Sequence, residues 1–136
     1  MAKPSADLIR GIPMFSELDD SSINQLADDF MEREFSAGQP MATEGEGGLN
    51  FFVVESGSVE VSVGGEVVGT LGPGASFGEV ALVDKSARSA TVTATSPMIA
   101  YALPIWSFRP FVEQRPELAW KLLEVLAERL RAANAR

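Results

Sequence analysis

The first part of the chain has the apolar spacing of an amphipathic helix. From residue 7 to residue 30, apolar side chains recur three or four positions apart, as they do on one face of a helix. The pattern is clearest at Ile23, Leu26, Ala27 and Phe30. Asp19 or Asp20 is placed to cap a helix that contains these residues, because a short carboxylate accepts the free N–H groups of a first turn. We therefore predict an N-terminal helical segment over residues 7–30.

Between residues 31 and 104 the pattern changes to short apolar runs separated by glycines and polar residues. One run alternates apolar and polar positions at Val59, Val61 and Val63, which is the period of a half-buried strand. Gly64-Gly65 follows it and predicts a two-residue hairpin turn. The strands predicted in this way cover residues 51–54, 59–63, 66–71, 90–94 and 98–103. Short strands at this spacing are typical of a β-sandwich or barrel.

The last part of the chain, residues 105–133, returns to a helical pattern and predicts two helices. The first covers residues 105–113 and contains Pro110, which favours a kink. Pro116 suits the start of the second helix. An apolar stripe then steps by four through Leu118, Leu122, Leu126 and Leu130, which indicates either a core face or a dimer seam. The whole chain, residues 1–136, is thus predicted to be one domain, mainly β with flanking helices.

The composition narrows the possible functions. The 136 residues contain no cysteine and no histidine, which excludes disulfides, thiolate metal sites, multi-histidine metal centres and Ser-His-Asp triads. We therefore expect no catalytic residue and no metal. The net charge of −8 opposes binding of nucleic acid by this chain alone. The N-terminal residues have no apolar signal-peptide region, and no run is long enough for a membrane span, so we expect a cytoplasmic protein without membrane contact.

The segment from residue 74 to residue 92 has an unusual combination of residues. Residues 78–83 have the length of one helical turn, and a turn that begins at Gly78 presents bare N–H groups to an anion. Arg88 brings a guanidinium that suits a phosphate, and Glu79 brings a carboxylate that suits sugar hydroxyls. Each also has a purely structural interpretation: Arg88 as a surface partner of Asp84, and Glu79 as a helix cap.

This segment closely resembles the phosphate-binding cassette of the cyclic nucleotide-binding domain family, which includes the bacterial catabolite activator protein and the regulatory subunits of protein kinase A. The matching residues are Phe77, Gly78, Glu79, Ala81, Leu82, Arg88, Ala90, Thr91 and Val92. Ile12-Pro13-Met14-Phe15 and Gly57 also match positions of that family, so the resemblance covers most of the chain. It implies a jelly-roll, or double-stranded β-helix, barrel over residues 31–104 with its cassette at residues 77–92.

The resemblance also implies the roles of individual residues. Glu79 is expected to bind the ribose 2′-hydroxyl, and Arg88 is expected to pair with the cyclic phosphate. The remaining ligand-binding positions of the cassette are Gly78, Val80, Ala81, Ser89 and Ala90. Val61 and Leu71 are placed beside the base. The expected ligand is cyclic AMP, with cyclic GMP as the second possibility.

Two departures from the family pattern affect the ligand site. Ala87 stands where many members have proline. Residues 116–133 contain no serine or threonine, so the last helix lacks a hydroxyl that some members use to contact adenine. The candidates for a residue that covers the base as a lid are Trp120, Leu123, Arg129, Leu130 and Arg131.

These observations lead to a ranked set of hypotheses. The first is a sensor module whose C-terminal helix changes position when a cyclic nucleotide binds and acts on a protein partner or a second copy. The second is an interaction protein that binds no nucleotide and has a degenerate cassette. The third is a cyclic AMP-dependent transcription regulator, which requires a helix-turn-helix that these residues do not contain. A barrel enzyme of the cupin type is disfavoured because the sequence has no histidine.

Overall fold

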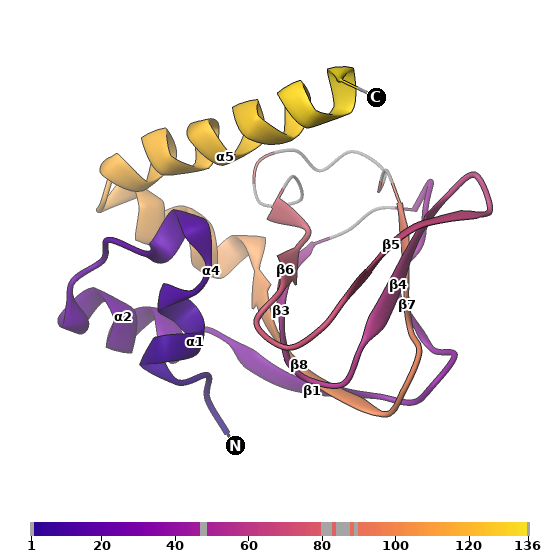
Figure 1. Cartoon of the computed structure of the whole chain (residues 1–136). Helices are drawn as coiled ribbons and strands as arrows, with labels where there is room; N and C mark the ends of the chain where they lie inside the picture. The colour runs from indigo at the N-terminus through magenta and orange to yellow at the C-terminus, as the bar shows by residue number, and fades with distance from the viewer. Residues whose placement is uncertain (1, 47–48, 80–82, 84–87, 89, 136) are drawn as a thin grey trace.

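The computed structural model describes residues 2–46, 49–79, 83, 88 and 90–135 of the chain. Within them, three short helices precede the strands and two helices follow (Figure 1). The N-terminal helices are α1 (Ala6–Arg10), η1 (Pro13–Phe15) and α2 (Asp20–Ala27). The C-terminal helices are α4 (Ile105–Glu113) and α5 (Glu117–Asn134). No helix in this described part is long and apolar enough to cross a membrane.

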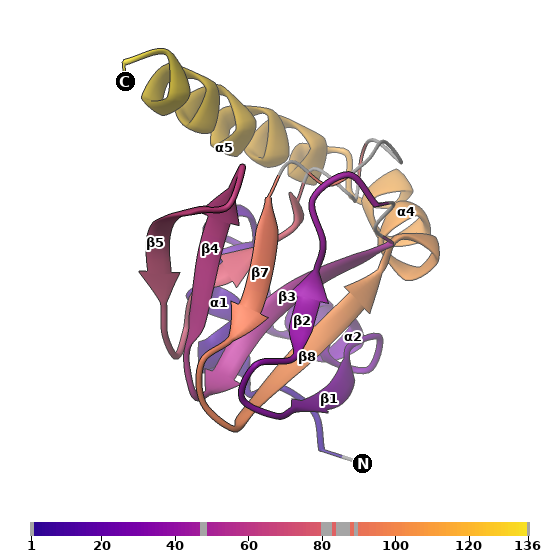
Figure 2. The ribbon, with the colours of Figure 1, turned by 90° about the vertical axis from the view of Figure 1, so that its right-hand side faces the viewer.

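The strands form two antiparallel sheets that face each other (Figure 2). One sheet has the order β1-β8-β3-β6, from β1 (Met31–Phe35), β8 (Met98–Pro104), β3 (Asn50–Ser56) and β6 (Ser76–Phe77). The other has the order β2-β7-β4-β5, from β2 (Pro40–Ala42), β7 (Thr91–Ala94), β4 (Val59–Val63) and β5 (Glu66–Leu71). This arrangement confirms the predicted fold class, mainly β with flanking helices.

The position of strand β3 in the fold explains why its sequence is a continuous apolar run. Phe52 and Val54 point into the core between the sheets, whereas Phe51 and Val53 point to the opposite face and pack against the helices. Successive side chains of a strand point to opposite faces, so a strand covered on both sides needs apolar residues at every position. The fold therefore has two cores, and β3 and β8 contribute to both.

The N-terminal segment is helical as predicted, but it is divided into three short helices. Ile23, Leu26, Ala27 and Phe30 are all buried in the core against the helices. Asp19 occupies the N-cap position of α2, but its side chain makes no capping hydrogen bond. The predicted hairpin turn at Gly64-Gly65 joins β4 to β5.

The structure supports most of the predicted leucine stripe on α5, and Leu126 packs partly buried against the core that the helices cover. Leu118 and Leu122 are buried, whereas Leu130 is 63% exposed. A helix turns by about 100° per residue, so a stripe that steps by four drifts by about 40° at each step. Leu130 has therefore turned about 120° away from Leu118, while Arg129 lies within about 20° of it. The inward face of α5 thus passes from leucine to arginine along the helix.

Candidate functional site

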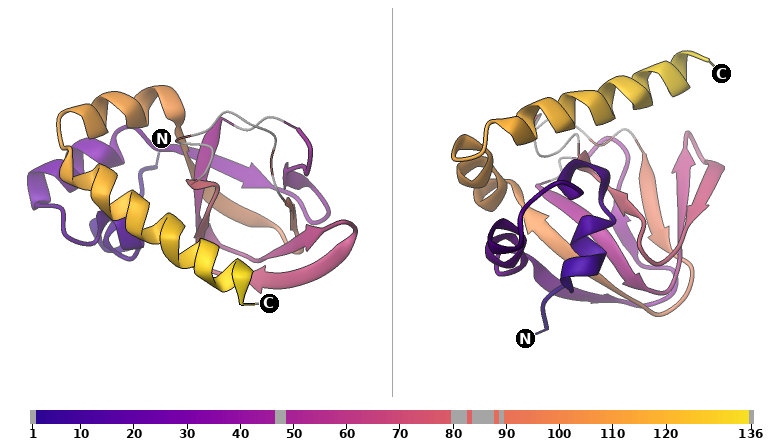
Figure 3. Two further views of the ribbon diagram at one scale, coloured as in Figure 1. Left: turned by 90° about the horizontal axis from the view of Figure 1, so that it is seen from above. Right: turned by 60° about the vertical axis from the view of Figure 1, so that its left-hand side comes forward.

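The cassette lies at one end of the two sheets, where β6 ends and β7 begins, and α5 passes above that end (Figure 3). Phe77 is buried in the core between the sheets, and its ring stacks on Phe52 with centroids 5.3 Å apart. This packing fixes the backbone directly before Gly78. Glu79 and Val83 are helical, in agreement with the predicted turn at residues 78–83.

Gly78 occupies a position that no other residue fits without strain. Its φ is +90°, a conformation that side chains with a Cβ rarely adopt. A Cβ built on it would lie 2.7 Å from Arg88 Nη1 and 3.0 Å from the carbonyl oxygen of Asn50. The glycine therefore allows the Arg88 guanidinium to rest directly on the backbone of the cassette.

The guanidinium of Arg88 is half-buried in this position. Nη2 donates a hydrogen bond of 2.7 Å to the carbonyl oxygen of Asn50, while Nε is buried with no partner in the described part of the chain. Burial lowers the pKa of Arg88, and the nearby carboxylate of Glu79 acts in the opposite direction. Arginine stays charged even so, because its ordinary pKa lies far above neutral pH. The site therefore holds a partly desolvated cation.

The backbone of Arg88 is held by the turn that follows β2. The Arg88 N–H donates to the carbonyl oxygen of Glu46 at 2.7 Å, and the Gly45 N–H donates to the carbonyl oxygen of Arg88 at 2.9 Å. Nearby, the Glu44 N–H donates to Thr91 Oγ1 at 2.9 Å. These bonds fix both the start of β7 and the arginine before it, and they give Thr91 of the cassette pattern a structural role.

Glu79 is buried, with only 3% of its surface exposed. Its Oε1 forms an ion pair with Nε of Arg129, which reaches down from α5. Its Oε2 is buried and has no hydrogen-bond partner in the described part. A buried carboxylate oxygen without a donor is costly, about 1–3 kcal/mol or more for a charged group. One oxygen of Glu79 therefore serves the fold, and the other accepts no hydrogen bond from the residues that the structure describes.

Unpartnered polar atoms concentrate at this end of the sheets. Among the described residues, four buried side-chain nitrogen or oxygen atoms have no partner, and three of them belong to Asn50, Glu79 and Arg88. Native proteins satisfy nearly all such groups, so a cluster of three needs an explanation. Two acceptors and one cationic donor suit a ligand that carries both hydroxyl donors and an anionic acceptor.

The structure places only part of the predicted ligand-binding set, and the binding roles of these residues stay a prediction. It brings Gly78, Glu79 and Arg88 together, and it places Ala90, partly buried, directly before β7. Val80, Ala81 and Ser89 lie outside the described residues, as do Asp84 and Ala87. Val61 and Leu71 pack at the edge of the core between the sheets, and their contact with a base stays a prediction.

Two residues at the site were missed by the sequence reasoning or left unresolved. Asn50 is the polar residue directly before the apolar run of β3, and its carbonyl receives Arg88. Arg129 was one of several lid residues that the sequence could not separate. Of those, Trp120, Leu123 and Leu130 are all more than half exposed, whereas Arg129 contacts Glu79. Residues 118, 122, 125 and 129 are three or four positions apart and therefore lie on one face of α5, and this spacing was the signal in the sequence that pointed to Arg129.

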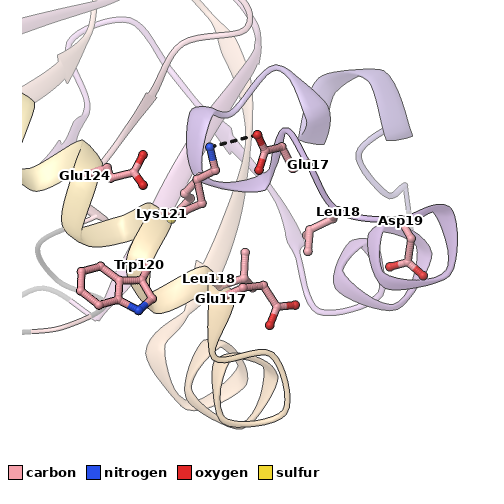
Figure 4. A pocket seen from close by; sticks show the side chains of 9 residues that line it. Glu17, Leu18, Asp19, Glu117, Leu118, Trp120, Lys121 and Glu124 are labelled. Carbon is pink, nitrogen blue, oxygen red and sulfur yellow. Dashed lines mark ion pairs between the residues drawn. The ribbon is translucent and has the colours of Figure 1, made fainter.

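Away from the cassette, a hollow of about 320 Å³ lies between η1 and the first turns of α5 (Figure 4). It is lined by Met14, Glu17, Leu18, Asp19, Glu117, Leu118, Trp120, Lys121 and Glu124, none of which belongs to the cassette. Lys121 pairs with Glu17 across it at 3.2 Å. This contact and the buried Leu118 hold the beginning of α5 against η1. In the described residues, no cluster of acidic side chains is placed to hold a metal ion.

Comparison with known proteins identifies the domain type. A model of the cyclic nucleotide-binding domain family matches residues 32–115. A solved structure, the catabolite activator protein of Thermus thermophilus, superposes with a TM-score of 0.81 at 30% identity, over 90% of this chain and 60% of that one. The two facing sheets are thus the jelly-roll arrangement of that protein.

Two curated proteins are also similar over part of their length. The chain is 38% identical over 96 residues to the cAMP-dependent protein kinase regulatory subunit of Yarrowia lipolytica, which covers 71% of this chain and 26% of that protein. It is 35% identical over 128 residues to Glutaminase 2 of Bradyrhizobium diazoefficiens, which covers 90% of this chain and 20% of that protein. The chain therefore spans about a quarter or less of the length of these relatives.

Proposed function

The chain belongs to the cyclic nucleotide-binding domain family, and from this we propose that it is a sensor module that binds cyclic AMP. The proposal treats residues 1–136 as one such domain, with an N-terminal helical segment at 7–30, a jelly roll at 31–104 and C-terminal helices at 105–133. The observation that carries it is the cluster of buried polar atoms on Asn50, Glu79 and Arg88 that have no hydrogen-bond partner among residues 2–46, 49–79, 83, 88 and 90–135.

The proposed ligand contacts follow from the charges at the site. The Arg88 guanidinium pairs with the cyclic phosphate, and Glu79 Oε2 accepts a hydrogen bond from the ribose 2′-hydroxyl. The backbone at Gly78, together with Val80, Ala81, Ser89 and Ala90 of the cassette, surrounds the phosphate. Gly78 supports this assignment because its missing side chain lets the guanidinium and the backbone approach one another. Each charge-assisted hydrogen bond contributes about 1.5–3 kcal/mol.

Cyclic AMP is proposed ahead of cyclic GMP. The name of the Yarrowia relative, a cAMP-dependent kinase subunit, supports this choice at 38% identity. No described contact distinguishes adenine from guanine, so the two nucleotides are compared directly in the experiment below.

The proposed output of the sensor is the position of α5. The helix crosses the end of the sheets that holds the cassette, and it carries exposed apolar residues at Trp120, Leu123 and Leu130. These residues repeat at spacings of three and seven and support an outer face that meets a second copy or a protein partner. A ligand shifts such a helix only by binding one position more tightly than the other.

The proposed role involves no catalysis and no metal. It is supported by a sequence without histidine or cysteine, the residues that most often act as general bases, nucleophiles and soft metal ligands. The same composition and the net charge of −8 support a module that does not bind DNA by itself.

The test is calorimetric titration of nucleotide-stripped protein with cyclic AMP and, separately, cyclic GMP. We expect the parent to bind cyclic AMP with a Kd of about 1 µM or tighter, which corresponds to about 8 kcal/mol. Arg88→Ala should weaken binding about 10- to 100-fold, because the phosphate loses its charged donor. The control is Arg109→Ala, which removes the same charge from an exposed position of α4.

The outcomes separate the proposal from its alternative. Equal affinity in Arg88→Ala and the parent would contradict the assigned phosphate contact. No heat with either nucleotide, together with no rise in melting temperature at millimolar ligand, would contradict nucleotide sensing altogether. The second result would favour an interaction protein with a degenerate cassette.

A further inference from the structure

The hollow between η1 and the start of α5 has an apolar interior (Figure 4). Met14 and Leu118 line it and are buried, and Leu18 lines it and packs partly buried against the same core. Its volume of about 320 Å³ falls within the range of small ligand pockets, about 300–1,000 Å³. The hollow therefore has room for a few side chains of a partner.

Trp120 also lines the hollow, and it is 70% exposed, more than any other large apolar side chain that the structure describes. An indole ring combines a large apolar area with a face that attracts cations. Tryptophan is enriched among the residues that contribute most to protein–protein binding. Its neighbour Leu118 is held in the core, so the backbone that carries the indole is in place without a partner. An exposed indole at this position suits a partner with both an apolar and a cationic group.

Acidic side chains dominate the edge of the hollow. Glu117 is three positions before Trp120 and Glu124 is four after it, so all three lie on the same side of α5. In the part of the chain that the structure describes, neither carboxylate forms an ion pair. Lys121 is the one basic residue among the described residues of the lining, and Glu17 already pairs with it at 3.2 Å. The hollow thus keeps an excess of negative charge beside an apolar surface.

We propose that this hollow is a docking site for a positively charged segment of a partner protein, one that carries lysine or arginine beside an apolar side chain. The apolar side chain enters the hollow, and the cation lies between Glu117, Glu124 and the face of Trp120. The site goes beyond the proposed function, because it uses no residue of the cassette and forms without a nucleotide.

The charge of the molecule argues against other occupants. A second copy that met this face across a two-fold axis would bring the same carboxylates together, and both copies carry a net charge of −8. Nucleic acid and anionic membrane surfaces are repelled for the same reason. A basic segment is attracted by the whole molecule and then by the hollow, so its association is also steered.

The test uses a short synthetic amphipathic peptide of leucine and lysine, together with a counterpart in which glutamate replaces every lysine. The chain has two tryptophans, so in Trp106→Phe the remaining indole is Trp120. We expect the lysine peptide to bind this variant with a Kd of about 100 µM or tighter. It should shift the emission of Trp120 to shorter wavelength, because apolar side chains replace water around the ring. High salt should weaken this binding, since the charges are exposed. The glutamate peptide should cause no shift.

Two variants of the hollow separate docking from a general effect of charge. Trp120→Ala should weaken binding of the labelled lysine peptide about 10-fold, measured by fluorescence anisotropy. Glu117→Gln combined with Glu124→Gln should weaken it about 3- to 10-fold. The matched control is Glu34→Gln combined with Glu55→Gln, which removes the same charge from exposed positions of β1 and β3 and should stay within about twofold of the parent. Circular dichroism and melting temperature establish that each variant is folded, as expected for exposed side chains.

Each outcome supports or overturns the docking site. Loss of affinity in both hollow variants, with the control near the parent, would support it. An equal loss in the control would overturn it, because the peptide would then respond only to net charge. Binding without a change in Trp120 emission would overturn it, as would no binding of the lysine peptide at millimolar concentration. None of these measurements uses cyclic AMP, so a failure here is distinct from a failure of nucleotide sensing.

Discussion

The close approach at Gly78 leads to a prediction whose magnitude can be estimated from the structure. In Gly78→Ala, the new Cβ meets Arg88 Nη1 at 2.7 Å and the carbonyl oxygen of Asn50 at 3.0 Å. Arg88 is a side chain that can move, but the carbonyl belongs to the first residue of the buried strand β3 and cannot retreat easily. The substitution therefore displaces the guanidinium and strains the backbone together.

Two costs add in this variant. A residue with a Cβ at positive φ costs about 1–2 kcal/mol. Forcing a methyl group into a filled space adds about 1–3 kcal/mol. We expect Gly78→Ala to lower the free energy of unfolding by about 2–5 kcal/mol. Because the guanidinium is displaced, cyclic AMP affinity should also fall at least about 10-fold.

Gly74, in the turn before β6, provides a matched control. Its φ is +88°, nearly that of Gly78, yet a Cβ there would meet no heavy atom within 4 Å. Gly74→Ala should therefore cost only the backbone term of about 1–2 kcal/mol and leave nucleotide affinity unchanged. Urea unfolding of the parent and both variants measures the stabilities, and calorimetry measures the affinities. Equal losses of stability in the two variants, with parental affinity in Gly78→Ala, would refute the steric argument.

Two further predictions concern parts of the fold away from the ligand. Burial raises the pKa of Tyr101 above its usual value of about 10, and the carboxylates of Glu55 and Glu32 act in the same direction. The folded state thus disfavours the phenolate, so the free energy of unfolding is retained below pH ~10 and falls as the pH rises above it. In urea unfolding, Tyr101→Phe should lose less stability than the parent at alkaline pH. The same dependence of stability on pH in the parent and the variant would contradict this prediction. On α5, Leu118→Ala should lower the free energy of unfolding by about 2–5 kcal/mol because Leu118 is only 3% exposed. Leu130 is 63% exposed, so Leu130→Ala should lower it by less than about 0.5 kcal/mol. Similar losses of stability in the two variants would show that the outer face of the helix is also packed.

The β part of the fold could be predicted because its signals are local. Alternation at Val59, Val61 and Val63 and the turn at Gly64-Gly65 depend only on neighbouring residues, and the structure contains the corresponding strands and turn. Strands β1, β2 and β6 were not predicted, and β6, two residues long, is too short to show a period. The helical pattern of residues 7–30 also did not indicate where the segment breaks into α1, η1 and α2, although Gly11 ends α1 and Pro13 begins η1.

The residues of the site could likewise be predicted only where their signal is local in the sequence. Gly78, Glu79 and Arg88 were found from a contiguous pattern, because a phosphate cradle is built from one turn and the residues beside it. Asn50 and Arg129 were not, because one is 28 residues before Gly78 and the other 50 residues after Glu79, and only the packed fold brings them to the cassette. Arg129 reaches Glu79 only if Leu118 and Leu122 seat the start of α5 correctly in the core against the helices. A substitution in that core should therefore release Arg129 from Glu79, although neither residue belongs to the core itself.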